Sequence, residues 1–301
     1  MKNFFATIIF LSAIIISSCN SSYERSEIFM GTVITLKAEG KNSQAAVEES
    51  FNRIAELEKN ILSDVEKIED AAEIDYVKIS PDGYKILETA QKYSELTDGA
   101  FDVTIGAAVE LWNIGTDKAR IPSDGELAAV KNFVGYNHLH LRGGKVYLDK
   151  RGVKINLGGL AKGYGVDLAR KIFAEHGIKD GLIDFGTSTI FAVGKKKIGI
   201  KNPRGDEISE VVELENSALS TSGDYEKFFI VDGRRYHHII NPKTCKPAES
   251  ENFSVSVIVG GGVENCATLA DILSTTAFIV GRERTENILT ENKIPAAIIC
   301  H

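Results

Sequence analysis

Two oxygen-bearing side chains near the C-terminal end have the spacing of a small metal site. Asp271 and Thr275 are four residues apart in an apolar segment typical of a helix, so the carboxylate and the hydroxyl project from the same helical face. Such hard oxygens suit Mg²⁺, which also keeps waters and recruits substrate phosphates. The alternative is structural: an aspartate favoured by the helix dipole and a threonine bonded to the helix backbone.

A glycine-rich segment at 156–164 (NLGGLAKGY) leads from a strand end into a helix. Its glycines expose backbone N–H and carbonyl groups, Lys162 adds a positive charge, and a helix N-terminus attracts anions. The segment matches neither GxxxxGK[ST] nor GxGxxG. The pattern therefore indicates either a phosphate contact or close packing of a strand against a helix.

Hydroxyl groups and two histidines follow at 220–225 (STSGDY) and 237–244 (HHIINPKT). Hydroxyls beside a turn glycine can hold phosphate oxygens, and His238 has the chemistry of a proton acceptor near neutral pH. Residues 238–240 are typical of a strand, on which neighbouring histidines point to opposite faces, so at most one of them faces a given site. A packed or surface histidine is the alternative.

A fourth segment, 97–104 (TDGAFDVT), is followed by Leu111 and Trp112. It places an aromatic ring, small residues and carboxylates at the end of a helix. A planar ring ligand would suit this surface. The alternative is that the Phe and Trp side chains fill the hydrophobic core.

These segments need a framework of helices and strands to bring them together. Apolar residues recur at intervals of three and four from Val47 to Ile61, with Asn42 or Ser43 available as the cap, and Ser80-Pro81 opens a second helix. Further helices are expected at 164–176, 267–280 and 282–291. Strands are expected at 29–38, 146–148, 181–185, 189–193, 211–214, 228–231, 238–240, 253–259 and 296–299. Because the two kinds of element do not alternate regularly, an α+β fold is favoured.

Composition limits the classes of function. The 301 residues suffice for one large domain or two smaller ones, and 43% hydrophobic with 26% charged residues is ordinary for a globular protein. The formal net charge of -7 argues against a chain that coats nucleic acid, so no nucleic-acid partner is expected.

The N-terminal residues predict export. The apolar stretch from Phe4 to Ile16 follows Lys2 and is too short to span a bilayer, as in a secretory signal. It ends at 16–19 (ISSC), which resembles a bacterial lipobox, so Cys19 is expected to carry lipid. An uncleaved anchor helix is the alternative. The chain is thus divided into a lipoprotein signal peptide at 1–18, a lipidated tether at 19–28 and a folded domain at 29–301.

In their order and residue identities, these segments resemble the ApbE-like FAD:protein FMN transferases over about Phe29 to Ile299. The matching stretches are Met30-Gly31-Thr32, 97–102 with Leu111-Trp112, 157–164, 221–225, 238–242, and Ala270-Asp271 with Thr275. Six separated motifs in one order are far more specific than any single motif, so the folded domain is identified as a flavin transferase domain by resemblance.

The resemblance implies a two-lobed α+β fold of mixed sheets flanked by helices, with FAD in a cleft between the lobes. It implies Mg²⁺ bound by Asp271, Thr275 and the backbone carbonyl of Gly159, and it makes His238 and Asp271 the expected catalytic residues. The expected FAD contacts are Met30, Ala100, Phe101, Asp102, Asn156, Lys162, Thr221, Ser222, Gly223 and His238.

The implied reaction is Mg²⁺-dependent transfer of FMN from FAD to a Ser or Thr hydroxyl of an exported flavoprotein, such as a subunit of a respiratory ion pump, with release of AMP. Lipid on Cys19 would anchor the enzyme to a bacterial membrane, on the periplasmic or outer face. Two alternatives stay open: an FAD diphosphatase that gives free FMN and AMP, and a non-catalytic flavin-binding lipoprotein.

Five positions depart from the family pattern. Asn241 and Cys245 replace the acid and the glycine of the common Asp-Pro-x-Thr-Gly run. Thr187 stands where many members carry a second glycine, Val65 lies where relatives often place an aromatic residue, and Asn156 replaces a usual aspartate.

Overall fold

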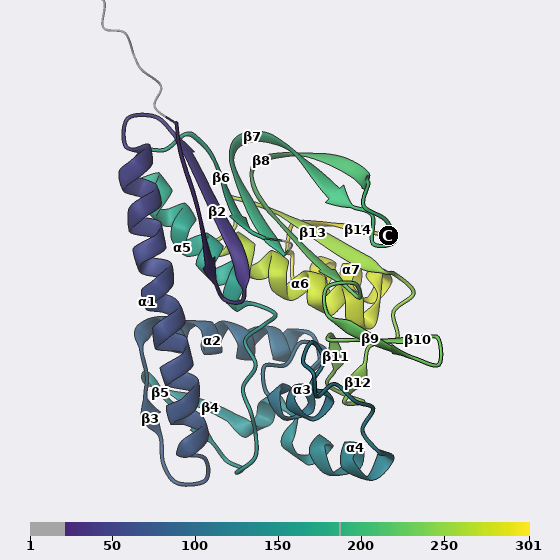
Figure 1. The fold of residues 1–301 in the computed structure, drawn as a ribbon. Helices are drawn as coiled ribbons and strands as arrows, with labels where there is room; N and C mark the ends of the chain where they lie inside the picture. The colour runs from purple at the N-terminus through teal and green to yellow at the C-terminus, as the bar shows by residue number, and fades with distance from the viewer. Residues whose placement is uncertain (1–21, 187) are drawn as a thin grey trace, which may run out of the picture.

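The computed structural model describes residues 22–186 and 188–301 and has an α+β fold, in which two lobes share one long helix (Figure 1). The predicted signal peptide at 1–18, Cys19 and Thr187 lie outside the described residues. Within the described ranges, no helix combines the length and the apolar character that crossing a membrane requires.

The larger lobe is built on a seven-stranded sheet with the order β1-β2-β6-β7-β8-β13-β14. Its strands are β1 (Ser22–Phe29), β2 (Thr32–Glu39), β6 (Asp180–Phe185), β7 (Thr189–Lys201), β8 (Ile208–Gly223), β13 (Ser254–Gly260) and β14 (Ala296–Cys300). All of its neighbouring strands are antiparallel, and in the described ranges the only parallel pairing is a single bridge between Ile105 and Lys154. The α+β class is confirmed, but the sheets are antiparallel where mixed sheets were predicted. Parallel neighbours need a crossover of about a dozen residues or more, whereas only Met30 and Gly31 lie between β1 and β2.

The folded body begins earlier in the chain than the sequence predicts. Residues 22–28, expected to form a tether, belong to β1, which pairs with β2 over its whole length. Met30 and Gly31 close this hairpin with φ angles of 52° and 72°, the left-handed conformation that tight two-residue hairpin turns use. One face of β1 is exposed and, apart from Ile28, polar, as suits the edge of a sheet. That polar face is what makes the segment look like a tether in the sequence.

Three helices cover one face of the large sheet (Figure 1): α1 (Ser43–Asp70), α5 (Ala161–Glu175) and α6 (Cys266–Val280). Apolar side chains of the helices and the sheet form the main core, which includes Ile34, Phe185 and Phe278. Helix α6 is enclosed by the sheet, by α5 and by α7 (Arg282–Glu291). From Cys266 to Phe278, only Thr275 is not buried.

The smaller lobe packs against the C-terminal half of α1. It contains α2 (Pro81–Leu96) and a sheet of β3 (Val77–Lys78), β5 (Lys145–Leu148) and β4 (Leu139–Arg142), around a second core. Helix α2 begins as predicted, since Ser80 Oγ accepts a hydrogen bond from Gly83 N at 3.0 Å and Pro81 follows. Met30 and Tyr93 pack against both cores and therefore mark the junction of the lobes.

A third apolar cluster lies beside the smaller lobe. It contains apolar residues of short elements: α3 (Gly106–Trp112), α4 (Asp124–Val130), β9 (Phe228–Val231), β10 (Arg234–His237) and β11 (Ile240–Asn241). The other short elements are two 3-10 turns (Lys131–Phe133 and Tyr136–His138) and β12 (Lys246–Pro247), which pairs with β11. The sequence prediction omitted α3 and α4. Both helices have only seven residues, too few for a clear apolar period.

Helices α5 and α6 touch through their backbones. A Cβ on Gly163 would lie 2.5 Å from the carbonyl oxygen of Ala267 and 2.7 Å from Thr268 Cα. The Asp167 carboxylate accepts hydrogen bonds from the N–H groups of Ala267 (3.1 Å) and Thr268 (2.8 Å), so a residue of α5 caps the start of α6. Burial raises the pKa of Asp167 and these bonds oppose the rise. The two helices are therefore fixed relative to each other.

We expect Gly163→Ala to lower the free energy of unfolding by about 1–3 kcal/mol, because the added methyl group overlaps backbone atoms that cannot rotate away. Chemical denaturation of the full chain would measure this. Gly125→Ala in α4 is the matched control: its Cβ would meet nothing within 4 Å, and alanine has the higher helix propensity. Equal denaturation midpoints for the two variants would contradict the close approach.

Candidate functional site

The Asp271 carboxylate links three elements. Its side chain is 3% exposed, and the Oδ2 atom accepts a hydrogen bond from Gly163 N at 3.0 Å, at the start of α5. The Oδ1 atom accepts from Ser220 Oγ of β8 at 3.2 Å. One turn further along α6, Thr275 Oγ1 lies 3.2 Å from Ser222 Oγ. The predicted placement of both residues on one face of a helix is confirmed.

The backbone carbonyl of Gly159 is open at the start of α5. Gly159 precedes Leu160, the cap residue of α5, so its carbonyl accepts no bond of the helix, and the N–H of Gly163, one of the donors that a helix start leaves without a helical partner, donates to Asp271. No hydrogen bond to the Gly159 carbonyl occurs within residues 22–186 and 188–301. Thr275 is close by, since a Cβ on Gly159 would lie 3.4 Å from Thr275 Oγ1.

These residues fit a magnesium ion. A carboxylate, a hydroxyl and an unpaired carbonyl are hard oxygen donors, and Mg²⁺ keeps waters and substrate oxygens in its remaining positions. In the described part of the chain, no group of three or more His, Cys, Asp or Glu side chains has an arrangement that could hold a metal ion. A cation at Asp271 would therefore depend on Thr275 and Gly159, with waters or substrate oxygens in its remaining positions.

The predicted flavin contacts around Phe101 lie at the edge of this cluster. A Cβ on Gly159 would lie 3.0 Å from Phe101 Cε2, so the phenyl ring borders the glycine loop. Ala100 and Asp102 are buried. Asp102 Oδ1 accepts hydrogen bonds from Thr104 N (2.8 Å) and Thr104 Oγ1 (2.7 Å), and burial raises the pKa of this carboxyl group. Asp102 thus shapes its own loop, and a direct FAD contact stays a prediction.

The other predicted contacts surround the start of α5. Met30 N donates to Glu58 Oε1 at 2.6 Å, and Met30 Cε would lie 3.7 Å from a Cβ on Gly165. Asn156 Oδ1 accepts from Gly158 N at 2.9 Å, and Lys162 Nζ donates to the carbonyl of Gly158 at 3.1 Å. The lysine charge therefore lies over the glycine loop, as an anion-binding site requires.

The prediction of a turn at 221–223 is wrong. Thr221, Ser222 and Gly223 are the last residues of β8, paired with β13. Small residues were interpreted as a turn, but the neighbouring strand supplies the backbone partners that hold them extended. Because alternate residues of a strand share a face, Ser220 and Ser222 both point to α6, whereas Thr221 Oγ1 lies 2.7 Å from Ser256 Oγ of β13.

His238 lies in a bend after β10, where a strand was predicted. Its backbone N–H donates to the carbonyl of Lys227, and its Nδ1 is buried without a partner in the described residues. Burial, with smaller contributions from the charges of His237, Lys227 and Lys162, lowers the pKa of His238 to about 4. The ring is therefore neutral at pH 7.

His237 points elsewhere, as expected for neighbouring histidines. Its Nε2 lies 2.9 Å from the carbonyl oxygen of Ala248, and its ring packs edge-on against Phe278 at 5.3 Å. Trp112 is likewise structural: it is 2% exposed, and its Nε1 donates to the carbonyl of Cys245 at 2.7 Å. The interpretation of Trp112 as a core residue is therefore confirmed.

Two departures from the family pattern have local explanations. Asn241 Oδ1 accepts from Lys243 N at 2.9 Å, a bond that an aspartate would also make. Cys245 has a φ of 54°, the left-handed conformation that favours glycine. Val65 packs against the second core.

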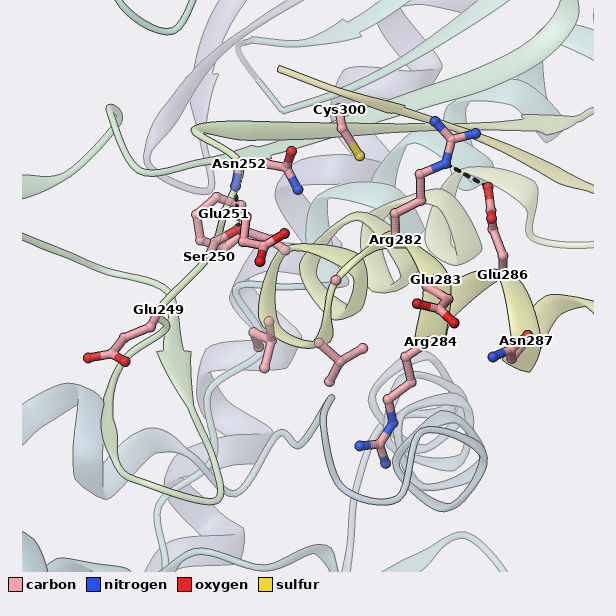
Figure 2. A pocket seen from close by; sticks show the side chains of 14 residues that line it. Glu249, Ser250, Glu251, Asn252, Arg282, Glu283, Arg284, Glu286, Asn287 and Cys300 are labelled. Carbon is pink, nitrogen blue, oxygen red and sulfur yellow. Dashed lines mark hydrogen bonds and ion pairs between the residues drawn. The ribbon is translucent and has the colours of Figure 1, made fainter.

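Figure 2 shows a separate pocket of about 700 Å³. It is lined by residues 249–252, 278–284, Glu286, Asn287 and Cys300. Charges of both signs face it, and Arg282 pairs with Glu286 at 2.7 Å. None of the predicted site residues lines it, so it is not the expected FAD cleft, which stays a prediction.

Comparison with known proteins decides the family. The model of the ApbE family matches residues 30–299. This chain belongs to the ApbE family. The FAD:protein FMN transferase of Treponema pallidum is 31% identical to it over 89% of this chain and 82% of the relative. That of Vibrio cholerae is 28% identical over 96% of this chain and 91% of the relative.

Solved structures agree. The ApbE protein of Thermotoga maritima is similar with a TM-score of 0.83 and 31% identity, covering 93% of this chain and 94% of the other. The flavin transferase ApbE of Vibrio cholerae has a TM-score of 0.81 and 26% identity, with the same coverage. The resemblance, the fold class and the assignment to a family of transferase enzymes are therefore confirmed.

Sequence reasoning missed Thr189 and Ser274, and it interpreted Ser220 as part of a phosphate-binding segment rather than as a partner of Asp271. Ser220, Thr189 and Ser274 are all fully buried, and each has a hydroxyl partner near the aspartate. A serine in a strand carries no distinctive pattern. The available signal was the alternation of Ser220 and Ser222, which becomes meaningful only once this end of β8 is known to face α6.

We expect nuclear magnetic resonance titration to give His238 a pKa near 4. The unfolded chain has an ordinary histidine pKa of about 6.5, so between pH 6.5 and 4 it binds more protons than the folded chain. His238 should therefore have no effect on stability above pH 6.5 and destabilise the fold progressively as the pH falls to 4. Across this window His238→Gln should lose less stability than the unchanged chain. Parallel stability curves would contradict the shift.

Proposed function

We propose that this chain is an FAD:protein FMN transferase that requires Mg²⁺, attaches FMN to a Ser or Thr hydroxyl of another protein and releases AMP. The names of its relatives support the flavin substrate and the protein acceptor. The observation that carries the metal requirement is the open carbonyl of Gly159 next to Thr275, which lies one turn from Asp271 on α6.

Asp271, Thr275 and the Gly159 carbonyl would hold the ion. When bound, Mg²⁺ neutralises oxygens of the FAD diphosphate, which otherwise repel an attacking oxygen. Lys162 and the N-terminus of α5 lie at the same loop and add positive potential for a diphosphate. Phe101 and Met30 would border the remainder of the FAD molecule.

His238 is the residue best suited to receive the proton. Its ring is neutral at pH 7, and a diphosphate placed beside it would raise its pKa. In the proposed step the acceptor oxygen forms a bond to the FMN phosphorus, the bond from that phosphorus to the AMP oxygen breaks, and the hydroxyl proton passes to the imidazole. AMP leaves with the electron pair of the broken bond.

We further propose that the enzyme is exported and anchored to a bacterial membrane by lipid on Cys19. The sequence of residues 1–19 supports this location. An acceptor at the same face of the membrane, such as a flavoprotein subunit of a respiratory ion pump, would then be within reach.

The decisive experiment is incubation of the full chain with FAD, Mg²⁺ and a peptide that carries an acceptor threonine. Mass spectrometry should detect a peptide that has gained FMN, together with an equal amount of AMP. Free FMN and AMP without the adduct would instead identify a diphosphatase. Unchanged FAD would identify a flavin-binding protein without transfer activity.

Asp271→Ala should abolish the adduct, because it removes the only carboxylate of the proposed cation site. The exposed Asp117 gives the matched control, and Asp117→Ala should leave the rate unchanged. Thermal unfolding without metal would show that both variants are folded. Full transfer by Asp271→Ala, or by the unchanged chain in EDTA, would refute the metal assignment.

A further inference from the structure

Strand β8 faces α6 with a row of hydroxyl groups. Ser220 and Ser222 are alternate residues, so both side chains project from one face of the strand, and each contacts a different turn of α6. Ser220 is fully buried and Ser222 is partly buried. Each hydroxyl group carries one proton. The contacts can therefore be followed back from a group that can only accept, which shows which hydroxyl donates in each contact.

The first hydroxyl chain ends on the Asp271 carboxylate. A carboxylate can only accept, so Ser220 donates its single proton to Oδ1 at 3.2 Å. Thr189 Oγ1 lies 3.0 Å from Ser220 Oγ, and because the Ser220 proton is already committed, Thr189 must be the donor in this contact. Thr189 is also fully buried. The direction is therefore Thr189 to Ser220 to Asp271.

The second hydroxyl chain ends on the backbone of the same residue. Ser274 Oγ donates to the carbonyl of Asp271 at 3.0 Å. Ser222, at 2.9 Å from Ser274 Oγ, must then donate to Ser274, and Thr275, at 3.2 Å from Ser222, must donate to Ser222. The Thr275 proton thus points at Ser222. Its oxygen lone pairs are left for a cation on the side of Gly159.

We propose that Ser220, supported by Thr189, is a positioning residue that fixes the orientation of the Asp271 carboxylate toward a divalent cation. The inference rests on the proposed function. The donors from Gly163 and Ser220 come from two different elements and hold one carboxylate oxygen each, so rotation of the carboxylate breaks both bonds. Groups that hold metal ligands in this way typically change metal affinity 10- to 100-fold when they are removed.

The test is a calorimetric titration of the FAD-free full chain with Mn²⁺, a probe that prefers the same oxygen ligands as Mg²⁺. Ser220→Ala should bind Mn²⁺ about 10- to 100-fold more weakly, because Asp271 loses one of its two donors. Thr189→Val should have a smaller effect in the same direction, since Ser220 can still donate. Thr189→Ser, which keeps the hydroxyl, should restore the original affinity.

Ser254→Ala is the matched control. Ser254 is a fully buried serine on the adjacent strand β13, and its hydroxyl has no partner in the described residues. This variant should bind Mn²⁺ like the unchanged chain. Thermal unfolding in EDTA separates lost metal affinity from lost stability for every variant.

The outcomes separate the inference from the function on which it rests. If the unchanged chain binds Mn²⁺ and Ser220→Ala binds it equally well, the positioning role is overturned while the proposed function stands. If Ser254→Ala binds Mn²⁺ as weakly as Ser220→Ala, the loss of affinity is general to the sheet, and the positioning role is again overturned. If the unchanged chain does not bind Mn²⁺, the proposed metal site fails, and the inference fails with it.

Discussion

The hydrogen bond from Gly163 N to the Asp271 carboxylate joins the start of one helix to the middle of another. It requires helices α5 and α6 to approach until their backbones touch, which only a glycine at this position permits. The Gly159 carbonyl, four residues before Gly163, has no hydrogen-bond partner in the described residues. The contact therefore packs two helices together beside an oxygen that is open for a cation, so stability and the proposed chemistry depend on neighbouring atoms.

The surrounding helices and the sheet bury this contact. Helix α6 is enclosed by sheet and helices, and Asp167 caps its first turn from α5. Only Thr275 escapes full burial between Cys266 and Phe278. A cation and a diphosphate would thus meet the helix at one position, where hydroxyl groups of β8 orient the oxygens that face them.

Charge and burial act together at this site. Lys162 lies over the glycine loop, and its charge adds a small contribution to the burial that keeps the pKa of His238 low. The ring is uncharged at pH 7, and its buried Nδ1 has no partner among the described residues. An anionic substrate would reverse this balance, because it would stabilise the protonated imidazole. The proton acceptor would then become effective only when the diphosphate is in place.

The sequence by itself determined the family, because six separated motifs stand in one order along the chain. It also determined the helix start at Ser80-Pro81 and the placement of Asp271 and Thr275 on one helix face, because these depend on neighbours within a few residues. It contained as well the Ser123 to Glu126 capping box of α4, which the prediction passed over. Only the tertiary structure decided that 221–223 is a strand, that residues 22–28 join the sheet and that Gly163 donates to Asp271. Those features depend on backbone donors and acceptors supplied by segments far away in the chain, and no local pattern of side chains records them.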